Sequence, residues 1–390
     1  MRRLRAFWVL GVVVFAAAAV GAQDGEKVNV YAREAEGKYV VLADNAYVIP
    51  VWISVGFPSL VNMKASVDIP YRALVPAGAR GQELFTLEAL AVSGRRGYRM
   101  AIAYAKGDPA AARPDEGCLY LFPFGHGTKH RVTQGYNGRF THQDGENRYA
   151  LDFDLAMNTP VFAARGGLVF DVKKNSTRGG MSPAYNKDAN FISVLHDDGT
   201  VGNYIHLKAG GALVGPGDRV EAGQLIGYSG NTGVSSGPHL HFDVQVPTPE
   251  GRMRSIPVRF LNYDGRAVEA REGGYYYAAH PGKPDFQAVF GSDLREEDFR
   301  GYSAAAALTG KVELRFELID ETYTVFVRNG TDSAKEVVVD FSLRNLVPSR
   351  PEPLSLTVPA LAERFLLLLR ARPGATGWEY GYSLRTKNVP

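Results

Sequence analysis

Cysteine is nearly absent from this sequence of 390 residues, in which Cys118 is the single cysteine. One cysteine excludes a disulfide within the chain. It also excludes a lipid anchor near the N-terminus, because such an anchor needs a cysteine at the processing point. Packing of apolar side chains, with or without a bound metal, must therefore hold the protein together.

The N-terminal apolar run, from Ala6 to Val20, is too short to span a membrane, which takes about 20 residues in a helix. It follows three arginines, at positions 2, 3 and 5, and ends before Gly21-Ala22. A basic start, an apolar centre and a small-residue end are the three parts of a secretory signal peptide. We expect cleavage after Ala22 and export of a mature protein without a membrane span.

Basic and acidic residues are also nearly balanced, so the chain has no large excess of either charge. The chain has 44 basic and 41 acidic residues, and removal of residues 1–22 takes away three arginines, which leaves 41 of each. No block rich in lysine and arginine remains, so the sequence lacks the basic patch typical of nucleic-acid binding. A hydrophobic content of 45% with 22% charged residues indicates a folded globular protein.

Short runs of alternating or β-branched apolar residues, cut by glycine, proline and asparagine, predict β-strands along most of the chain. No long amphipathic helix is evident between them, so the expected fold class is all-β. The length favours several domains. The segments expected are a signal peptide at 1–22, a β-rich domain at 23–115, a central domain at 116–263, an irregular connection at 264–308 and a β-sandwich-like domain at 309–390.

The C-terminal part shows the alternation clearly. Strands are predicted at Val312–Leu318, Tyr323–Val327 and Val337–Leu343. Asn329-Gly330 lies between the last two and is a strong signal for a hairpin turn. We therefore expect these two strands to pair directly with each other.

The central domain holds the candidate chemistry, because seven of the eight histidines lie between positions 119 and 262. His239 and His241 are two residues apart at the start of an apolar run, and residues i and i+2 of a strand share a face. Such a pair suits a metal ligand beside a group that handles protons. Asp243 would lie on the same face, either orienting His241 or facing solvent.

Three more residues complete this set. Asp152 alternates with Leu151 and Phe153, which aims its carboxylate away from the core. His142 precedes it in a loop. His206 lies on another alternating run, which predicts that it shares a face with Tyr204.

The run from Val220 to Phe242, which ends in Gly237-Pro238-His239-Leu240-His241-Phe242, resembles the signature of the lysostaphin and LytM family of zinc endopeptidases. Tyr204–Leu207 and Leu151–Phe153 resemble two further motifs of the family. The resemblance covers roughly residues 134–246. It implies an antiparallel β-sheet that forms a narrow groove, with zinc at its floor, and cleavage of peptide bonds in the bacterial cell wall.

Carried over by position, the resemblance implies His142, Asp152 and His241 as zinc ligands. It implies His206 and His239 as non-ligand histidines that hydrogen-bond the water and stabilise the oxyanion, and which of them takes the proton stays open. The family commonly places the aspartate four residues after the first histidine, whereas ten separate them here. Asp144 and Asp154 are therefore alternatives to Asp152. We interpret His126 and His130 as ordinary loop residues.

The function expected is that of an exported zinc metallo-endopeptidase that hydrolyses peptidoglycan peptides. It would be periplasmic, or extracellular and associated with the cell wall. The alternative is a catalytically silent protein of the same fold that binds the wall or activates another wall hydrolase. Silent members typically lack ligands or catalytic histidines, whereas all five positions are filled here.

Overall fold

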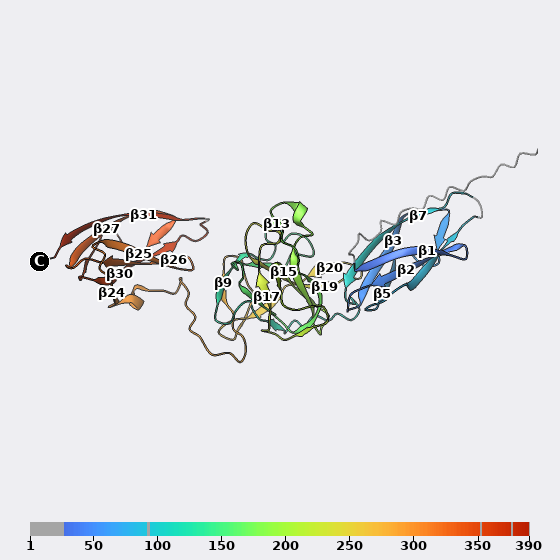
Figure 1. Cartoon of the computed structure of the whole chain (residues 1–390), viewed down its shortest axis with the longest axis horizontal. Helices are drawn as coiled ribbons and strands as arrows, with labels where there is room; N and C mark the ends of the chain where they lie inside the picture. Colours follow the sequence, from blue (N-terminus) through green and yellow to red (C-terminus); the bar gives the residue numbers. More distant parts are fainter. Residues whose placement is uncertain (1–26, 92–93, 352, 376, 390) are drawn as a thin grey trace, which may run out of the picture. The chain divides into compact units, whose positions relative to one another are not determined.

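The computed structural model describes residues 27–91, 94–351, 353–375 and 377–389 (Figure 1). The expected signal peptide, residues 1–22, lies outside the described residues. The regular elements of the described residues are β-strands and two 3₁₀-helices, η1 (Pro183–Tyr185) and η2 (Glu296–Phe299), with no α-helix. The all-β prediction is confirmed. No helix in the described part of the chain is long and apolar enough to cross a bilayer.

The chain divides into two compact units, Met1–Pro284 and Asp285–Pro390. The first unit begins with two antiparallel sheets over a shared apolar core, to which Val41, Ile53 and Leu87 contribute fully buried side chains. One sheet has the order β1 (Val28–Ala35), β2 (Lys38–Asn45), β6 (Gln82–Ala89), β4 (Met63–Ala65). The other has the order β5 (Tyr71–Val75), β3 (Val51–Val61), β7 (Gly97–Lys106).

The largest sheet follows in the same unit, and its strand pairs are all antiparallel. Its main order is β16 (Arg219–Val220), β12 (Gly167–Lys173), β14 (Asn190–Leu195), β15 (Val201–Ala212), β19 (Leu240–Pro247), β10 (Leu151–Phe153), β9 (Lys129–Gln134), β23 (Tyr275–Tyr277). Three strands pair at its side: β11 (Pro160–Phe162) with β17 (Leu225–Ser229), β17 also with β15, and β20 (Met253–Ser255) with β19. The antiparallel sheet implied by the family resemblance is therefore present.

Two small sheets accompany the large one. β13 (Gly179–Gly180) pairs in parallel with β18 (Gly233–Val234), and β21 (Arg259–Leu261) lies between β22 (Ala267–Val268) and β8 (Leu119–Tyr120). Strands β22 and β23 both fall in the stretch expected to be an irregular connection. β23 returns to pair with β9, so residues beyond position 263 contribute to the edge of the large sheet.

One face of the large sheet covers an aromatic core. Phe153 and Phe242 are buried there against Phe122 and Phe260, whose rings stack with centroids 4.6 Å apart. Burying a side chain of this size stabilises the fold by about 1.5–3 kcal/mol. Because strand residues alternate between faces, this burial directs the neighbours Asp152 and His241 to the opposite face.

The second unit consists of two antiparallel sheets around a core of its own, as the sandwich prediction requires. One sheet has the order β24 (Ser303–Ala305), β30 (Ala362–Ala371), β26 (Thr322–Asn329), β25 (Val312–Ile319), with β28 (Leu346–Pro348) beside β30. The other has the order β29 (Leu354–Val358), β27 (Lys335–Arg344), β31 (Glu379–Asn388).

The predicted hairpin at Asn329-Gly330 is wrong. Strands β26 and β27 on either side of it belong to different sheets, and β26 pairs instead with β25 and β30. The side-chain amide of Asn329 donates to the carbonyls of Ser333, Val358 and Pro359 at 2.9–3.1 Å. These bonds hold a connection that crosses between the sheets, where a tight hairpin would keep both strands in one sheet.

Candidate metal centre

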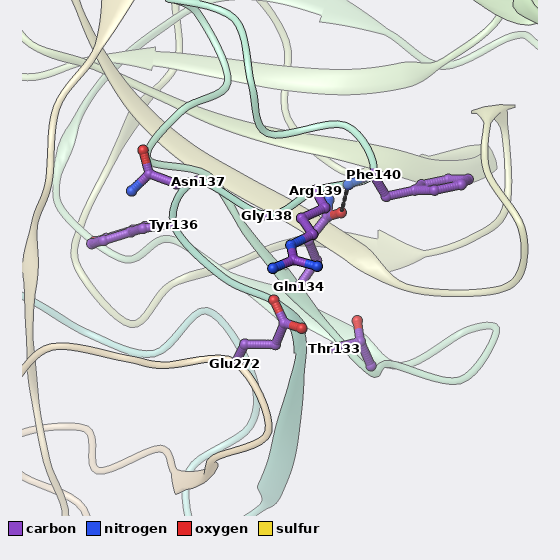
Figure 2. Close-up of a pocket in the computed structure, with 8 residues that line it drawn as sticks. All are labelled: Thr133, Gln134, Tyr136, Asn137, Gly138, Arg139, Phe140 and Glu272. Carbon is purple, nitrogen blue, oxygen red and sulfur yellow. Dashed lines mark hydrogen bonds between the residues drawn. The ribbon is translucent and has the colours of Figure 1, made fainter. Parts of the chain in front are cut away.

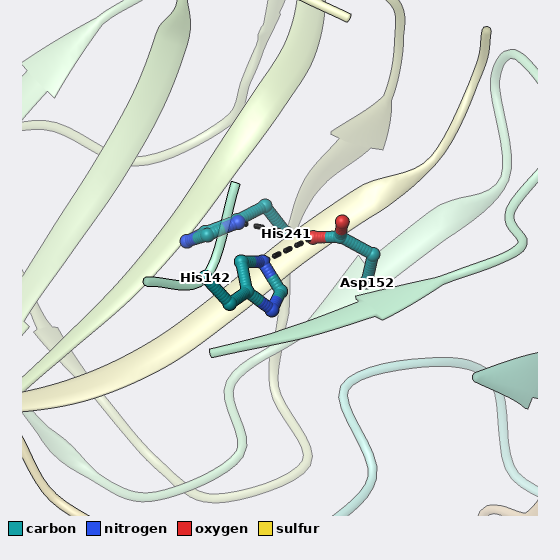
Figure 3. Close-up of side chains that lie close together, drawn as sticks. All are labelled: His142, Asp152 and His241. Atoms are coloured by element: carbon teal, nitrogen blue, oxygen red, sulfur yellow. Dashed lines mark hydrogen bonds and ion pairs between the residues drawn. The ribbon is translucent and has the colours of Figure 1, made fainter. Parts of the chain in front are cut away.

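Two neighbouring strands bring two of the predicted ligands together. Asp152 on β10 lies directly opposite His241 on β19 in the antiparallel ladder. His142 joins them from the loop between β9 and β10. One ligand atom from each of the three side chains lies within 4.8 Å of the others, and all three residues are buried (Figure 3).

His142 presents a free ring nitrogen to this cluster. Its Nδ1 lies 2.9 Å from the carbonyl of Gly135, which can only accept, so Nδ1 carries the proton. Its Nε2 is buried without a hydrogen-bond partner and lies 3.4 Å from Oδ1 of Asp152. A buried acceptor nitrogen without a donor costs free energy, and a cation at this point would relieve that cost. The residues present therefore fit a metal ion.

His241 lies between two carboxylates. Its Nδ1 is 3.0 Å from Oδ1 of Asp152, and its Nε2 is 3.2 Å from Oδ2 of Asp243. Burial alone would lower the pKa of His241, but hydrogen bonds to Asp152 and Asp243 outweigh it and raise that pKa to about 10. The position strongly favours positive charge, as a metal-binding position should.

Asp152 shows the complementary effect. Burial would raise the pKa of its carboxyl group, but the close approach of His142 and the hydrogen bond from His241 hold that pKa well below its usual range. The carboxylate therefore stays ionised at any pH at which the protein would act. An ionised carboxylate and two imidazoles are one of the donor sets found in catalytic zinc sites.

Asp243 is buried at 1% exposure, so the solvent-facing alternative does not apply. Its second oxygen, Oδ1, accepts a hydrogen bond of 2.7 Å from the side-chain amide of Asn203 on β15. Asn203 thereby fixes Asp243, and Asp243 in turn orients the imidazole of His241. A histidine ligand commonly donates its other ring N–H to a carboxylate in this way.

Gln134, at the end of β9, is a contributor that the sequence did not reveal. Its side-chain amide donates to Oδ2 of Asp152 at 3.1 Å and to the hydroxyl of Thr141 at 2.6 Å. Its carbonyl oxygen accepts from the backbone N–H groups of Phe140 and Thr141. One side chain thus holds both the carboxylate and the loop that delivers His142. No local pattern marks it, because these contacts arise only when β9 pairs with β10.

The alternatives to Asp152 lie elsewhere. Asp144 accepts hydrogen bonds from the backbone of Glu146 and from Asn147, and so shapes the inserted loop. Asp154 is exposed, one residue beyond β10. His126 lies in a loop as expected, but His130 lies in strand β9, where its Nδ1 contacts the backbone carbonyl of Asp154 at 2.8 Å.

His206 reaches the cluster through a β-bulge. The pairing of β14 with β15 shifts register so that Asn190 faces Leu207 and Phe191 faces Ile205, which leaves His206 as the extra residue. Its φ is +69°, a conformation that side chains with a Cβ rarely adopt. The prediction that His206 shares a face with Tyr204 is wrong, because Tyr204 is fully buried in the core and the bulge turns His206 towards His239 and His241.

His206 and His239 form a second pair of imidazoles, with ring centroids 4.5 Å apart. His206 Nδ1 donates to the carbonyl of Thr232 at 2.7 Å, and His239 Nδ1 donates to the carbonyl of Gly237 at 2.8 Å. Each Nε2 is therefore left for other partners, and that of His239 lies 3.9 Å from Oδ1 of Asp152. Burial, with repulsion from His239 and His241, lowers the pKa of His206 to about 3, so this ring is neutral near pH 7.

Comparison with known proteins matches residues 146–253 to the sequence model of peptidase family M23. The matched stretch includes Asp152, His206, His239 and His241 and begins four residues after His142, so the inserted loop falls at its edge.

Among characterised proteins, glycyl-glycine endopeptidase ALE-1 of Staphylococcus capitis is 35% identical over 123 residues, 31% of this chain and 31% of its own length. Lysostaphin of Staphylococcus simulans is 34% identical over 123 residues, 31% of this chain and 23% of its own length. Peptidoglycan DD-endopeptidase ShyA of Vibrio cholerae is 30% identical over 122 residues, 30% of this chain and 26% of its own length. The chain thus matches less than a third of the length of each of these relatives.

Among solved structures, the catalytic domain of lysostaphin from Staphylococcus simulans is 31% identical and aligns with 33% of this chain and 87% of its own, with a TM-score of 0.24.

Proposed function

Since residues 146–253 belong to peptidase family M23, we propose that this chain is an exported zinc metallo-endopeptidase that hydrolyses peptide bonds in peptidoglycan. The observation that carries the proposal is the buried cluster of His142, Asp152 and His241, with the unpartnered Nε2 of His142 facing the carboxylate. Two imidazoles and one carboxylate leave the fourth position of a tetrahedral ion open, which is characteristic of a catalytic zinc site.

A zinc ion held by these three side chains would polarise a peptide carbonyl and lower the pKa of a water to around 7. The residues around the cluster supply the remaining interactions. His206 is neutral and has its Nδ1 proton committed to Thr232, so its Nε2 accepts a hydrogen bond from the attacking water. His239 lies beside it, and we assign to these two imidazoles together the proton transfer and the stabilisation of the oxyanion.

Asp243 and Gln134 act through the ligands and do not contact the substrate in this proposal. Asp243 orients His241, and Gln134 positions Asp152 and the loop of His142. Such partners limit the motion of the ligands, which keeps the site ready to bind metal.

The proposal extends to the rest of the chain. Residues 1–22 would direct export to the periplasm or the cell wall and be removed after Ala22. We keep 23–115, 116–263 and 309–390 as the proposed limits of the N-terminal, peptidase and C-terminal domains, with 264–308 between the last two.

The test is incubation of the zinc-loaded mature protein with purified peptidoglycan, followed by mass spectrometry of the soluble peptides. We expect new peptide termini that do not form when zinc is removed with a chelator and that return when zinc is restored. Binding to peptidoglycan without new termini would refute hydrolysis and favour the silent wall-binding or activating protein.

A further inference from the structure

Gln134, which holds Asp152, also lines a pocket (Figure 2). Its volume is about 390 Å³. The loop after β9 supplies Tyr136, Gly138, Arg139 and Phe140, and the segment before β23 supplies Glu272. The amide of Gln134 that lines this pocket also donates to Oδ2 of Asp152, so one hydrogen bond separates the pocket wall from a metal ligand.

The walls of this pocket are held in place by the rest of the domain. Tyr136 places its hydroxyl 3.0 Å from both the carbonyl and the N–H of Val258. Gly138 lies so close to Gln134 that a Cβ at this position would approach Cγ of Gln134 to 2.4 Å. A side chain at position 138 would therefore displace the loop, and glycine lets it lie directly on Gln134.

Two opposite charges face the pocket. Arg139 is exposed, and within the described residues its guanidinium has no ion-pair partner within 4.0 Å. Glu272 is also exposed and uses Oε2 to accept from the N–H of Gly135 at 3.2 Å, which leaves Oε1 for another donor. Figure 2 shows both side chains directed into the space between the loop and the segment that carries Glu272.

Phe140 also lines the pocket, with 69% of the residue exposed. A large aromatic side chain in such an open position is a common contact for the aliphatic part of a ligand. The pocket lining therefore includes a cation, an anion and an apolar side chain, and Gln134 connects it to Asp152.

We propose that this pocket is a specificity subsite for a peptide side chain that has an aliphatic stem and ends in an α-amino acid zwitterion. Arg139 binds the carboxylate, where the planar guanidinium can donate two parallel hydrogen bonds. Glu272 accepts from the ammonium group, and Phe140 packs on the stem. The inference rests on the proposed peptidase function, because the peptide must reach the cluster and the pocket together.

Three synthetic peptides of the form L-Ala-γ-D-Glu-X-D-Ala separate these contacts. With diaminopimelate as X the side chain carries the full zwitterion, with lysine it keeps the ammonium but lacks the carboxylate, and with Nε-acetyl-lysine it lacks both charges. Binding is measured by calorimetry on the full zinc-loaded chain carrying His239→Ala, which slows turnover. Arg219→Ala is the matched control, because this arginine is also exposed and lies on β16, at the opposite end of the sheet from β9.

We expect Arg139→Ala to weaken binding of the diaminopimelate peptide about tenfold or more and to leave binding of the lysine peptide unchanged. Only the diaminopimelate side chain has a carboxylate for Arg139 to bind. Glu272→Gln should remove the preference for lysine over acetyl-lysine. Arg219→Ala should bind all three peptides as the parent does. Zinc content should be the same in every variant.

If Arg139→Ala binds the diaminopimelate and lysine peptides as the unsubstituted protein does, the subsite proposal is wrong. Turnover of peptidoglycan by the chain with His239 intact is measured in parallel. Hydrolysis without any dependence on Arg139 or Glu272 overturns the subsite alone, whereas absence of hydrolysis overturns the peptidase proposal on which it rests.

Discussion

Asp152 and His241 lie directly opposite each other on two antiparallel strands, with 3.0 Å between Oδ1 and Nδ1. The backbone ladder of β10 and β19 therefore fixes the relative position of these two side chains. His142 differs, because it comes from a loop and depends on Gln134 and Gly135 for its place. A rigid pair and a tethered third residue make up the candidate zinc site.

The first prediction concerns zinc content. The purified protein should hold about one zinc ion per chain, because three side chains converge on one point. His241→Ala should lose most of this zinc, since it removes the ligand atom between two carboxylates. Metal analysis after dialysis measures the effect, and a variant that keeps a full equivalent of zinc would contradict the ligand assignment.

The second prediction compares the effect of Asp243 on zinc affinity with that of Asp154, another carboxylate of the same domain. Asp243→Asn should weaken zinc binding about 10- to 100-fold, because the neutral amide orients His241 less strongly than the carboxylate does. Asp154→Asn is the control, since Asp154 is exposed and outside the cluster. Competition with a chelator gives both affinities. Equal affinities in the two variants would show that Asp243 has no role in zinc binding.

Gln134 gives the third prediction. Gln134→Leu should weaken zinc binding about tenfold, because it removes a hydrogen bond to Asp152 and releases the loop of His142. Thr133→Ala is the matched control on the same strand, because the hydroxyl of Thr133 donates to the backbone carbonyl of Asp152 and leaves its carboxylate to Gln134. The same chelator competition applies. If Thr133→Ala lowered zinc affinity as much as Gln134→Leu, strand β9 as a whole would be responsible.

The fourth prediction is a pH dependence of stability at His196, remote from the cluster. Burial lowers the pKa of this histidine from 6.5 to about 4, and its Nδ1 lies 2.9 Å from the carbonyl of Gly166. Above pH 6.5 the ring is neutral in both states. As the pH falls from 6.5 to 4, the unfolded chain binds a proton that the folded chain resists, so the folded state loses about 3 kcal/mol.

His196→Asn tests this, because the asparagine amide can still donate to Gly166 but does not titrate. The free energy of unfolding is measured by urea denaturation at pH 7 and pH 4.5 for both proteins. We expect a smaller loss of stability in the variant, since all other titrating groups are shared. Equal losses would mean that His196 is not held neutral by the fold.

Part of the candidate site could be predicted from the sequence, because Asp152, His239 and His241 lie in short motifs whose geometry is local. Alternation of Leu151, Asp152 and Phe153 is enough to aim the carboxylate, and the spacing of His239 and His241 is enough to put them near each other. The strands could be predicted from the same alternation of apolar and polar residues, because this pattern is typical of strands with one buried face.

Features that depend on pairing between distant strands could not be predicted. The bulge at His206 exists because β14 pairs with β15 in a shifted register, and nothing within Asn203–Leu207 reveals that shift. The hairpin prediction at Asn329-Gly330 was wrong for a related reason. A turn signal gives the local bend of the chain, but the sheet that the next strand joins depends on residues far away, here Val358 and Pro359.

The last prediction separates catalysis from metal binding. His206→Ala and His239→Ala should each keep zinc and lower the rate of peptidoglycan hydrolysis by about 10²- to 10⁴-fold, the usual cost of losing a proton-transfer or oxyanion contact. Both rings have Nδ1 committed to a backbone carbonyl, which leaves one nitrogen each for the reacting groups.

His130→Ala is the control for this last prediction. The Nδ1 of His130 also contacts a carbonyl, but its ring packs against Phe124, whose side chain is fully buried. Its hydrolysis rate and zinc content should stay close to those of the parent. If His206→Ala or His239→Ala lost its zinc, that histidine would be a ligand. If both of these variants kept full activity, the catalytic groups would have to lie elsewhere in the chain.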